Sequence, residues 1–368
     1  MNRLSAQELE QLASCVRSPE GDTPRPSPEV LFRAALLESS IKDVSWRAFV
    51  RVSQETLAHM EEDADVWERV AFARDIARRH TGEPALLEWP GDAQWFTSLD
   101  ADAQLAALAH AVQSAADADL DVVASYAEAA VARLGSVPPR AEMLMLLGAV
   151  GRAYAAVGAF AEATHSLERA VDGWFALGQA PSASHALCEL LRVRGVQRDA
   201  ASVQGLRPRI EHLLDLTKDA NSAAFTRLAL GRALAQSGDL EGGRAALDDE
   251  VASWAAAPAH AQASRLRWLH FLEISRGDDG AAHRRLEEFD TLRDEGEPYD
   301  SDQLYLARID RALAWGTVLT PHVEELLSLL PGGDEAARML VRLAPYVPRA
   351  VAMNDRSVLA RLAWEYRY

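Results

Sequence analysis

The chain has 368 residues and a formal net charge of −17, with 55 acidic residues against 38 basic ones. Its 49% hydrophobic and 7% aromatic content is typical of a helix-rich globular protein. The surplus negative charge argues against unaided binding to nucleic acid or to an anionic membrane, because such binding draws its affinity from surplus cations. We therefore expect no direct nucleic-acid partner and no membrane association.

Cysteine and lysine are scarce, and their scarcity excludes several kinds of chemistry. Cys15 and Cys188 are the two cysteines, so neither a disulfide framework nor a four-thiolate zinc site is available. Lys42 and Lys218 are the two lysines, and neither follows the glycine-rich turn of a phosphate-binding loop. A reducing compartment suits this cysteine content, and we expect a cytoplasmic protein.

The first part of the chain predicts a helical N-terminal module over residues 1–98. A proline-rich stretch at 18–28 indicates an exposed linker after a first helix. Three further helices are predicted at about 28–40, 43–60 and 64–80.

A DNA-binding helix-turn-helix is one interpretation of these helices. Residues 30–80 contain eight basic and nine acidic residues, which is a poor electrostatic footprint for DNA. We therefore interpret the N-terminal module as a helical protein-interaction module.

From about residue 100 the sequence repeats with a period of 40. One column of this repeat contains Asp119, Ala159, Asp199, Asp239 and Asp279. Four of the five are aspartates, which can cap a helix by accepting from its first free backbone N–H groups. The column therefore predicts a turn followed by the second helix of each repeat.

Other columns keep the same period or twice that period. They are Val150, Leu190 and Leu230; Gly151 and Gly231; Gly158 and Gly238; and Trp174 and Trp254. Between the turns the apolar residues follow helical spacing. Helical hairpins at a fixed period predict a solenoid, because each hairpin buries its apolar faces against its neighbours.

Two stretches carry a family resemblance. In LLGAVGRAYAAVGAFAEATHSLERAV the signature spacings are occupied by Val150-Gly151, Tyr154, Gly158, Phe160, Ala163, Leu167 and Ala170. In LALGRALAQSGDLEGGRAAL they are occupied by Leu230-Gly231, Leu234, Gly238, Leu240, Gly243 and Leu247. Both stretches resemble tetratricopeptide repeats, whose small residues let the two helices of a hairpin approach closely.

The resemblance implies a right-handed, all-α solenoid of helix-turn-helix repeats over 99–296, and it is clearest over 140–256. The period of 40 departs from the usual 34 of the family, and the late proline is missing from the first copy. The longer period resembles the helical-repeat sensor arms of bacterial signalling ATPases and transcription regulators, although no ATPase motif is present. Residues 297–368 are predicted to form degenerate repeats or capping helices, because an open solenoid end exposes an apolar face.

An arginine column is the first candidate binding site. Arg152, Arg192 and Arg232 recur every 40 residues on the first helix of three hairpins. The resemblance implies that this position faces the concave groove, where three guanidinium groups would suit carboxylates or phosphates. The alternative is that each arginine pairs with acidic neighbours and has a structural role.

An aromatic cluster is the second candidate. Trp89, Trp95 and Phe96 lie beside Pro84 and Pro90. Exposed aromatic residues near prolines can anchor a partner. The alternative is that they fill the junction between two helical modules.

No catalytic pattern emerges from the sequence. The histidines have neither the spacing of a zinc protease nor a cysteine nearby, and the signatures of serine hydrolases and kinases are absent. We therefore expect no enzyme, no metal and no cofactor.

Two functions remain open. The first is a non-catalytic adaptor or scaffold that binds a partner protein or peptide, one with an acidic or carboxylate group, on its repeats. The alternative is a sensor whose repeats bind a small molecule or signalling peptide and control the N-terminal module.

Overall fold

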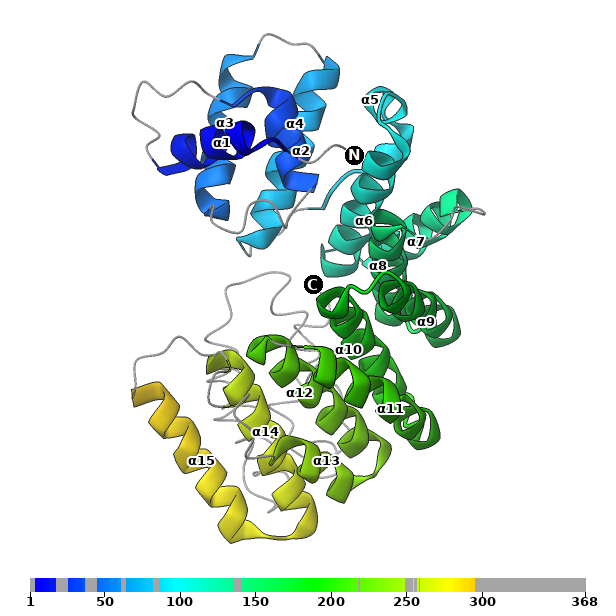
Figure 1. Ribbon diagram of the computed structural model, residues 1–368, viewed down its shortest axis with the longest axis vertical. Coiled ribbons are helices and arrows are strands. Elements are labelled where there is room, and N and C mark those ends of the chain that lie inside the picture. Colours follow the sequence, from blue (N-terminus) through cyan, green and yellow to red (C-terminus); the bar gives the residue numbers. More distant parts are fainter. Residues whose placement is uncertain are drawn as a thin grey trace, which may run out of the picture. The chain divides into compact units, whose positions relative to one another are not determined.

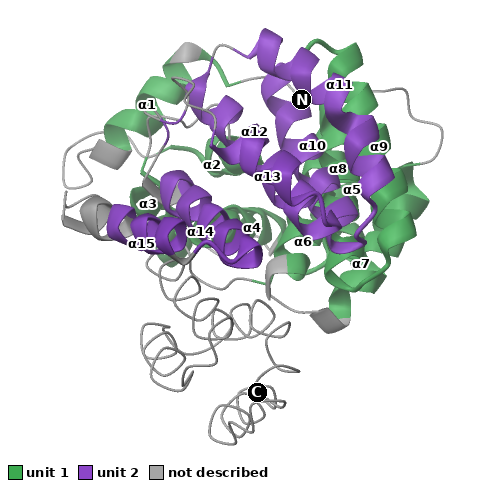
Figure 2. Ribbon diagram, turned by 90° about the horizontal axis from the view of Figure 1, so that it is seen from below, with its two compact units in different colours: residues 1–179 green, residues 180–368 purple. Residues whose placement is uncertain are grey.

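A computed structural model shows that the chain is all-α, as predicted (Figure 1). The structure describes residues 4–17, 26–36, 45–60, 64–81, 86–118, 120–134, 140–217, 219–248, 254, 257 and 259–294. The predicted capping helices at 297–368 lie outside the described residues, as does most of the predicted linker at 18–28. The chain divides into two compact units, residues 1–179 and residues 180–368 (Figure 2). The predicted domain boundary near residue 98 stays a prediction.

Unit 1 begins with a helical module. Its helices are α1 (Ala6–Arg17), α2 (Pro28–Leu36), α3 (Trp46–His59) and α4 (Ala64–His80). Both α2 and α3 pack against α4, and the buried side chains between them include Phe32, Phe49 and Ile76.

Local hydrogen bonds explain where the first two helices begin. Ser5 and Glu8 form a reciprocal capping box at α1, with the Glu8 N–H donating to Ser5 Oγ at 3.2 Å and the Ser5 N–H donating to Glu8 Oε2 at 2.7 Å. At α2, Ser27 Oγ accepts from the Val30 N–H at 3.3 Å, and Pro28 takes the first helical position. The predicted helix start at residue 28 is therefore confirmed.

The remainder of unit 1 contains a short connection and two helical hairpins. The connection comprises the 3₁₀ helix η2 (Pro90–Asp92) and the short helix α5 (Gln94–Thr97). The hairpins are α6 (Ala101–Ala118) with α7 (Leu120–Leu134), and α8 (Ala141–Ala156) with α9 (Phe160–Ala176). The first helices of the two hairpins, α6 and α8, pack side by side.

The described part of unit 2 contains three more hairpins built on the same plan. They are α10 (Ala180–Val196) with α11 (Ala200–Leu216), α12 (Ala220–Ser237) with α13 (Leu240–Leu247), and α14 (Ala259–Arg276) with α15 (Asp279–Asp294). The first helices again neighbour each other, because α12 contacts both α10 and α14. The predicted stacking of hairpins in series is thus observed within each unit.

The turns inside the last four hairpins, from α8–α9 to α14–α15, share a recurring conformation. Gly158, Gly238 and Gly277 have positive φ angles of 79°, 98° and 77°. Arg198 takes the equivalent place with φ 55°, a conformation that costs a non-glycine residue free energy. These residues end the first helices in the left-handed conformation that lets the chain reverse.

The aspartate column marks the last three of these turns, with one correction at the last, and its first member, Asp119, lies outside the described residues. Asp199 and Asp239 cap α11 and α13, accepting from backbone N–H groups at 3.0 and 2.8 Å. At α15 the accepting carboxylate belongs to Asp278 and not to the predicted Asp279, since Asp278 Oδ1 accepts from the Ala281 N–H at 2.9 Å. The last interval is therefore 39 residues, and the strict period of 40 was wrong there.

The recurrence of glycine at positions 151 and 231 has a direct steric cause. A Cβ atom at Gly151 would lie 2.5 Å from Leu167 Cγ, and one at Gly231 would lie 2.4 Å from Leu247 Cγ. Both leucines belong to the second helix of the same hairpin and are fully buried. The predicted packing role of these glycines is confirmed.

The N-cap position of α9 has no capping side chain, and this predicts a stabilising substitution. Ala159 precedes α9 where Asp199 and Asp239 cap the equivalent helices, and it provides no side-chain cap. We expect Ala159→Asp to stabilise unit 1 by about 0.5–1 kcal/mol, because the new carboxylate accepts from N–H groups in the first turn. Urea unfolding followed by circular dichroism measures the change. Asp239→Ala is the converse variant and should shift the midpoint downwards, whereas equal effects of both substitutions would contradict the capping interpretation.

Candidate functional site

The predicted aromatic cluster lies within unit 1, and two of its members are buried. Trp95 is 3% exposed and Phe96 is 4% exposed. The Trp95 ring lies 5.5 Å from Phe32 of α2 and 5.4 Å from Phe72 of α4, measured between ring centroids. Trp95 therefore packs the connection against the N-terminal module.

Trp89 packs the same connection, formed by η2 and α5, against α7. Its ring lies 5.0 Å from Tyr126, and the Arg133 guanidinium carbon lies 5.7 Å from Trp89 and 5.5 Å from Phe96. Arg133 Nη2 also donates to the Gly91 carbonyl at 3.2 Å. These contacts favour the interpretation in which the cluster packs the junction between two helical modules. A partner-binding role for the cluster stays a prediction.

The predicted arginine column is divided between the two units. Arg152 lies on α8 in unit 1, where it is half-buried and makes no ion pair with another described residue. Arg192 and Arg232 lie on the neighbouring helices α10 and α12 of unit 2. The structure thus brings two of the three arginines onto packed helices, and the three-membered ladder stays a prediction.

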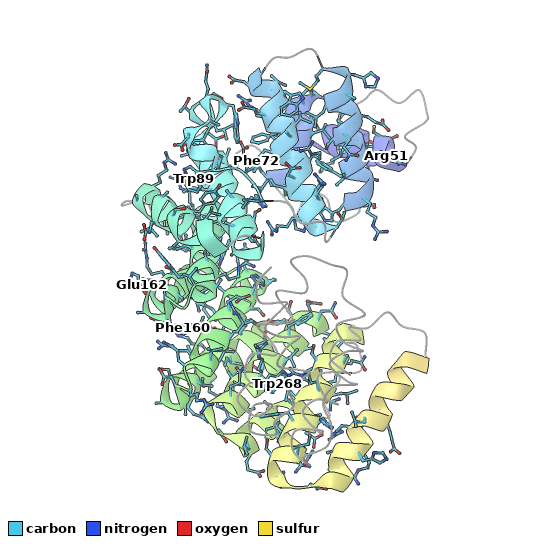
Figure 3. The ribbon with its side chains drawn as sticks, turned by 180° about the vertical axis from the view of Figure 1, so that it is seen from behind. Arg51, Phe72, Trp89, Phe160, Glu162 and Trp268 are labelled. Carbon is cyan, nitrogen blue, oxygen red and sulfur yellow. The ribbon has the colours of Figure 1, made fainter. Side chains whose placement is uncertain are left out.

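The two arginines of unit 2 have different environments. Arg192 Nε lies 2.9 Å from Glu189 Oε2 one turn earlier on the same helix. Arg232 instead extends to the next hairpin, where its guanidinium carbon lies 5.4 Å from the centroid of the Trp268 ring on α14. Trp268 is labelled in Figure 3. A cation over the face of an indole is attracted by the negative face of the ring.

Three residues of α14 complete this arrangement and were missed in the sequence. The Arg267 guanidinium carbon lies 5.2 Å from the same Trp268 ring, and Phe271 contacts that ring edge-on at 5.5 Å. The cap at Asp278 shows that the last repeat interval is 39 residues. Phe271 lies 39 residues after Arg232 and therefore occupies the same repeat position. A strict period of 40 points instead to Leu272, which is fully buried.

A polar contact fixes α10 beside α12. The hydroxyl groups of Ser184 and Thr226 lie 2.7 Å apart in the buried seam, and the Cys188 thiol donates to the Phe225 carbonyl at 3.7 Å. Burial raises the pKa of the Cys188 thiol to about 12. The thiol is therefore protonated at neutral pH and is not a nucleophile.

We call the resulting surface of unit 2 the first-helix face, defined by Arg192, Phe225, Arg232, Arg267 and Trp268. Phe225 is 37% exposed and lies two helical turns before Arg232 on α12, so the two side chains occupy the same side of that helix. The face therefore combines guanidinium groups with exposed aromatic surface, which suits a ligand with both an anionic group and an apolar side chain.

Among the residues that the structure describes, no three histidine, cysteine, aspartate or glutamate side chains are grouped in a way that could hold a metal ion. None of the helices there has the length and hydropathy needed to cross a membrane.

No protein-family model and no curated protein sequence matches the chain. Solved structures do match, among them the crystal structure of a Rap protein complexed with competence and sporulation factor. The similarity covers 98% of this chain and 96% of that chain, with a TM-score of 0.54 and 14% sequence identity. At this identity the likeness concerns the fold. The chain is therefore an all-α protein with tetratricopeptide-like repeats and an N-terminal helical module, similar in fold to the Rap protein over nearly its whole length.

Proposed function

We propose that the chain is a non-catalytic regulator whose repeats bind a signalling peptide and thereby control what the N-terminal module contacts. The observation that carries the proposal is the extent of the structural match, which includes both the module and the repeats. The Rap structure contains a bound competence and sporulation factor, so this architecture accommodates such a factor in that protein. We place the chain in the cytoplasm as part of the same proposal.

The first-helix face supports a ligand on unit 2. Arg232, Arg267 and Trp268 come from two different hairpins, α12 with α13 and α14 with α15. A ligand that contacts all three residues would favour the arrangement of the two hairpins in which these residues lie close together. By linkage, binding to one arrangement shifts the population towards it.

The connection between module and repeats supports transmission within unit 1. The Leu87 N–H donates to Ser114 Oγ of α6 at 2.9 Å, and the Tyr126 hydroxyl of α7 donates to the Leu87 carbonyl at 3.3 Å. A change in how α6 and α7 pack would therefore move the connection that leads to α4. Trp67 of α4 is 41% exposed, and Arg51 of α3 is exposed, so both can contact an output partner.

The adaptor interpretation is the second candidate, in which the repeats hold a segment of a larger protein. Exposed Phe225 and the arginines of the first-helix face also suit such a segment. The two candidates differ in the size of the bound species and in whether binding alters the N-terminal module.

Hydrogen exchange of the full-length chain separates the two candidates. We expect a host peptide fraction below about 3 kDa to slow exchange in α10, α12 and α14 and to change exchange in α1–α4. A host protein fraction depleted of peptides is the control. Protection by the protein fraction alone would favour the adaptor, and protection without any change in α1–α4 would contradict control of the module.

A further inference from the structure

The described part of unit 2 contains two junctions between successive hairpins, and small residues close the first, where α10 lies beside α12. A Cβ atom at Gly195, in the last turn of α10, would lie 2.9 Å from Ala233 Cα. In the second turn of α10, the Ser184 hydroxyl lies 2.7 Å from the Thr226 hydroxyl of α12. The two helices therefore approach closely towards both ends of α10. Such close packing leaves α12 little room to move relative to α10.

The second junction, between α12 and α14, is filled by long side chains. Along its length α12 lies nearer to α10 than to α14. From α14, Leu269 and Leu272 fill the buried cluster at this junction, and Trp268 and Phe271 pack against that cluster. Arg232 of α12 extends to the Trp268 ring. Long side chains can change rotamer as two helices slide, so this junction tolerates movement better than the first.

Arginines from both helices of the last hairpin bind the end of α13. Arg265 Nε of α14 donates to the Leu247 carbonyl at 2.6 Å, and Arg285 Nη2 of α15 donates to Asp248 Oδ1 at 2.9 Å. Leu247 is the last residue of α13, and Asp248 follows it. Cations stabilise the end of a helix, where the last carbonyl groups have no partner within the helix.

α13 contributes a third arginine that extends in the opposite direction. Arg244 Nε lies 3.2 Å from Oε1 of Glu273, an almost fully buried residue of α14. Contacts of charged side chains thus join α13 to both helices of the next hairpin. We call this set the arginine latch; it consists of Arg244, Arg265 and Arg285 with their partners Leu247, Asp248 and Glu273.

The arginine latch holds like charges close together. Burial and the nearby Arg285 charge lower the pKa of Arg265, and Asp248 and Glu288 act in the opposite direction. Arg285 Nη1 lies 3.0 Å from Glu288 Oε1. Two cations held together repel each other, and the carboxylates offset that repulsion. Because the latch balances opposing charges, salt and single substitutions can shift it.

We infer that the second junction is a hinge of unit 2 and that the arginine latch holds this hinge closed. When the latch opens, hairpin α14–α15 moves relative to hairpin α12–α13, while the first junction keeps its geometry. This movement changes the distance between Arg232 of α12 and Trp268 of α14, so the latch controls whether the first-helix face is assembled. The hinge does not depend on the proposed function, because it concerns contacts of the chain with itself.

Distances between spin labels in the full-length chain test the hinge. Cys15 and Cys188 are first replaced by alanine. Nitroxide labels are then attached to cysteines placed at exposed positions of α11, α13 and α15, namely Asp215, Ala245 and Arg284. Labels at 245 and 284 span the second junction, and labels at 215 and 245 span the first. Double electron–electron resonance measures both distance distributions.

Opening the latch should change one of these distances and not the other. We expect the double variant Arg265→Gln with Arg285→Gln to lengthen the 245–284 distance by at least about 2 Å, more than a helix shifts within an intact interface. The 215–245 distance should stay constant. Raising NaCl from about 0.1 M to about 1 M shortens the Debye length from about 10 Å to about 3 Å, and should broaden the 245–284 distribution of the chain with its latch intact.

A charge-matched control lies on α11. Arg207→Gln with Arg209→Gln removes equal charge from exposed positions and should leave both distances unchanged. Circular dichroism verifies that each variant is folded, and the salt series decides the matter if the latch variant is not. A change confined to the 245–284 distance, under either perturbation, supports the hinge. Equal changes in both distances, or a 245–284 distance that responds to neither perturbation, would overturn it.

Discussion

Replacing Arg244 by alanine is expected to destabilise unit 2 by about 2–4 kcal/mol. Arg244 of α13 lies 3.2 Å from the almost fully buried carboxylate of Glu273 on α14, and it lies 3.7 Å from Asp248. Removing the guanidinium leaves a charge buried without this partner, which costs more than the pair itself contributes. Arg244 is partly exposed, so we place the effect below that of a fully buried pair.

Two variants make this prediction specific. Arg207→Ala on α11 breaks an ion pair in which both side chains are at least half exposed, and we expect it to cost at most about 0.5 kcal/mol. Arg244→Met combined with Glu273→Leu removes both charges and should recover most of the lost stability. Hydrogen exchange of α13 and α14 in increasing urea reports on unit 2. A double variant no more stable than Arg244→Ala would show that the buried charge is not the cause.

Replacing Gly231 by alanine is expected to destabilise unit 2 by about 1–3 kcal/mol. The new Cβ would lie 2.4 Å from Leu247 Cγ and 3.1 Å from the Gly243 carbonyl oxygen. Leu247 is fully buried, so it has little space to move away. α12 and α13 would therefore have to separate.

Gly205→Ala is the matched control for this substitution. Gly205 lies inside α11, and a Cβ there meets no atom within 4 Å. Alanine should stabilise the helix there by about 0.5–1 kcal/mol, because it loses less backbone entropy on folding. Shifts of the urea midpoint in opposite directions support close helix approach at Gly231, and shifts of the same sign would contradict it.

Much of the fold could be predicted from the sequence because the same local signals recur in several of the hairpins. The aspartate column marks caps that the structure places at Asp199 and Asp239, and the glycines mark close helix approach. These signals depend on local backbone geometry, which repeats with the period. The shorter last interval was missed, because adjacent aspartates at 278 and 279 both look like caps in the sequence.

The candidate site was less predictable, because its contacts connect different hairpins. Arg232 was singled out by its column, but its neighbour Trp268 has no counterpart in the other repeats and drew no attention. Trp95 and Phe96 were prominent in the sequence because they lie near prolines, yet they are buried. Burial is set by the packing of α2, α4 and α5 together, which spacing along the chain does not reveal.

Photo-crosslinking in the native host tests the central claim most directly. The residue p-benzoylphenylalanine, placed at Phe225 of the first-helix face, abstracts hydrogen from whatever lies against it under ultraviolet light. The same residue at Leu216, which is exposed at the end of α11, is the control. We predict an adduct at position 225 of about 1 kDa, the mass of a short peptide, that is absent at position 216. An adduct of protein size at position 225, or no adduct at all, would contradict a peptide-binding regulator.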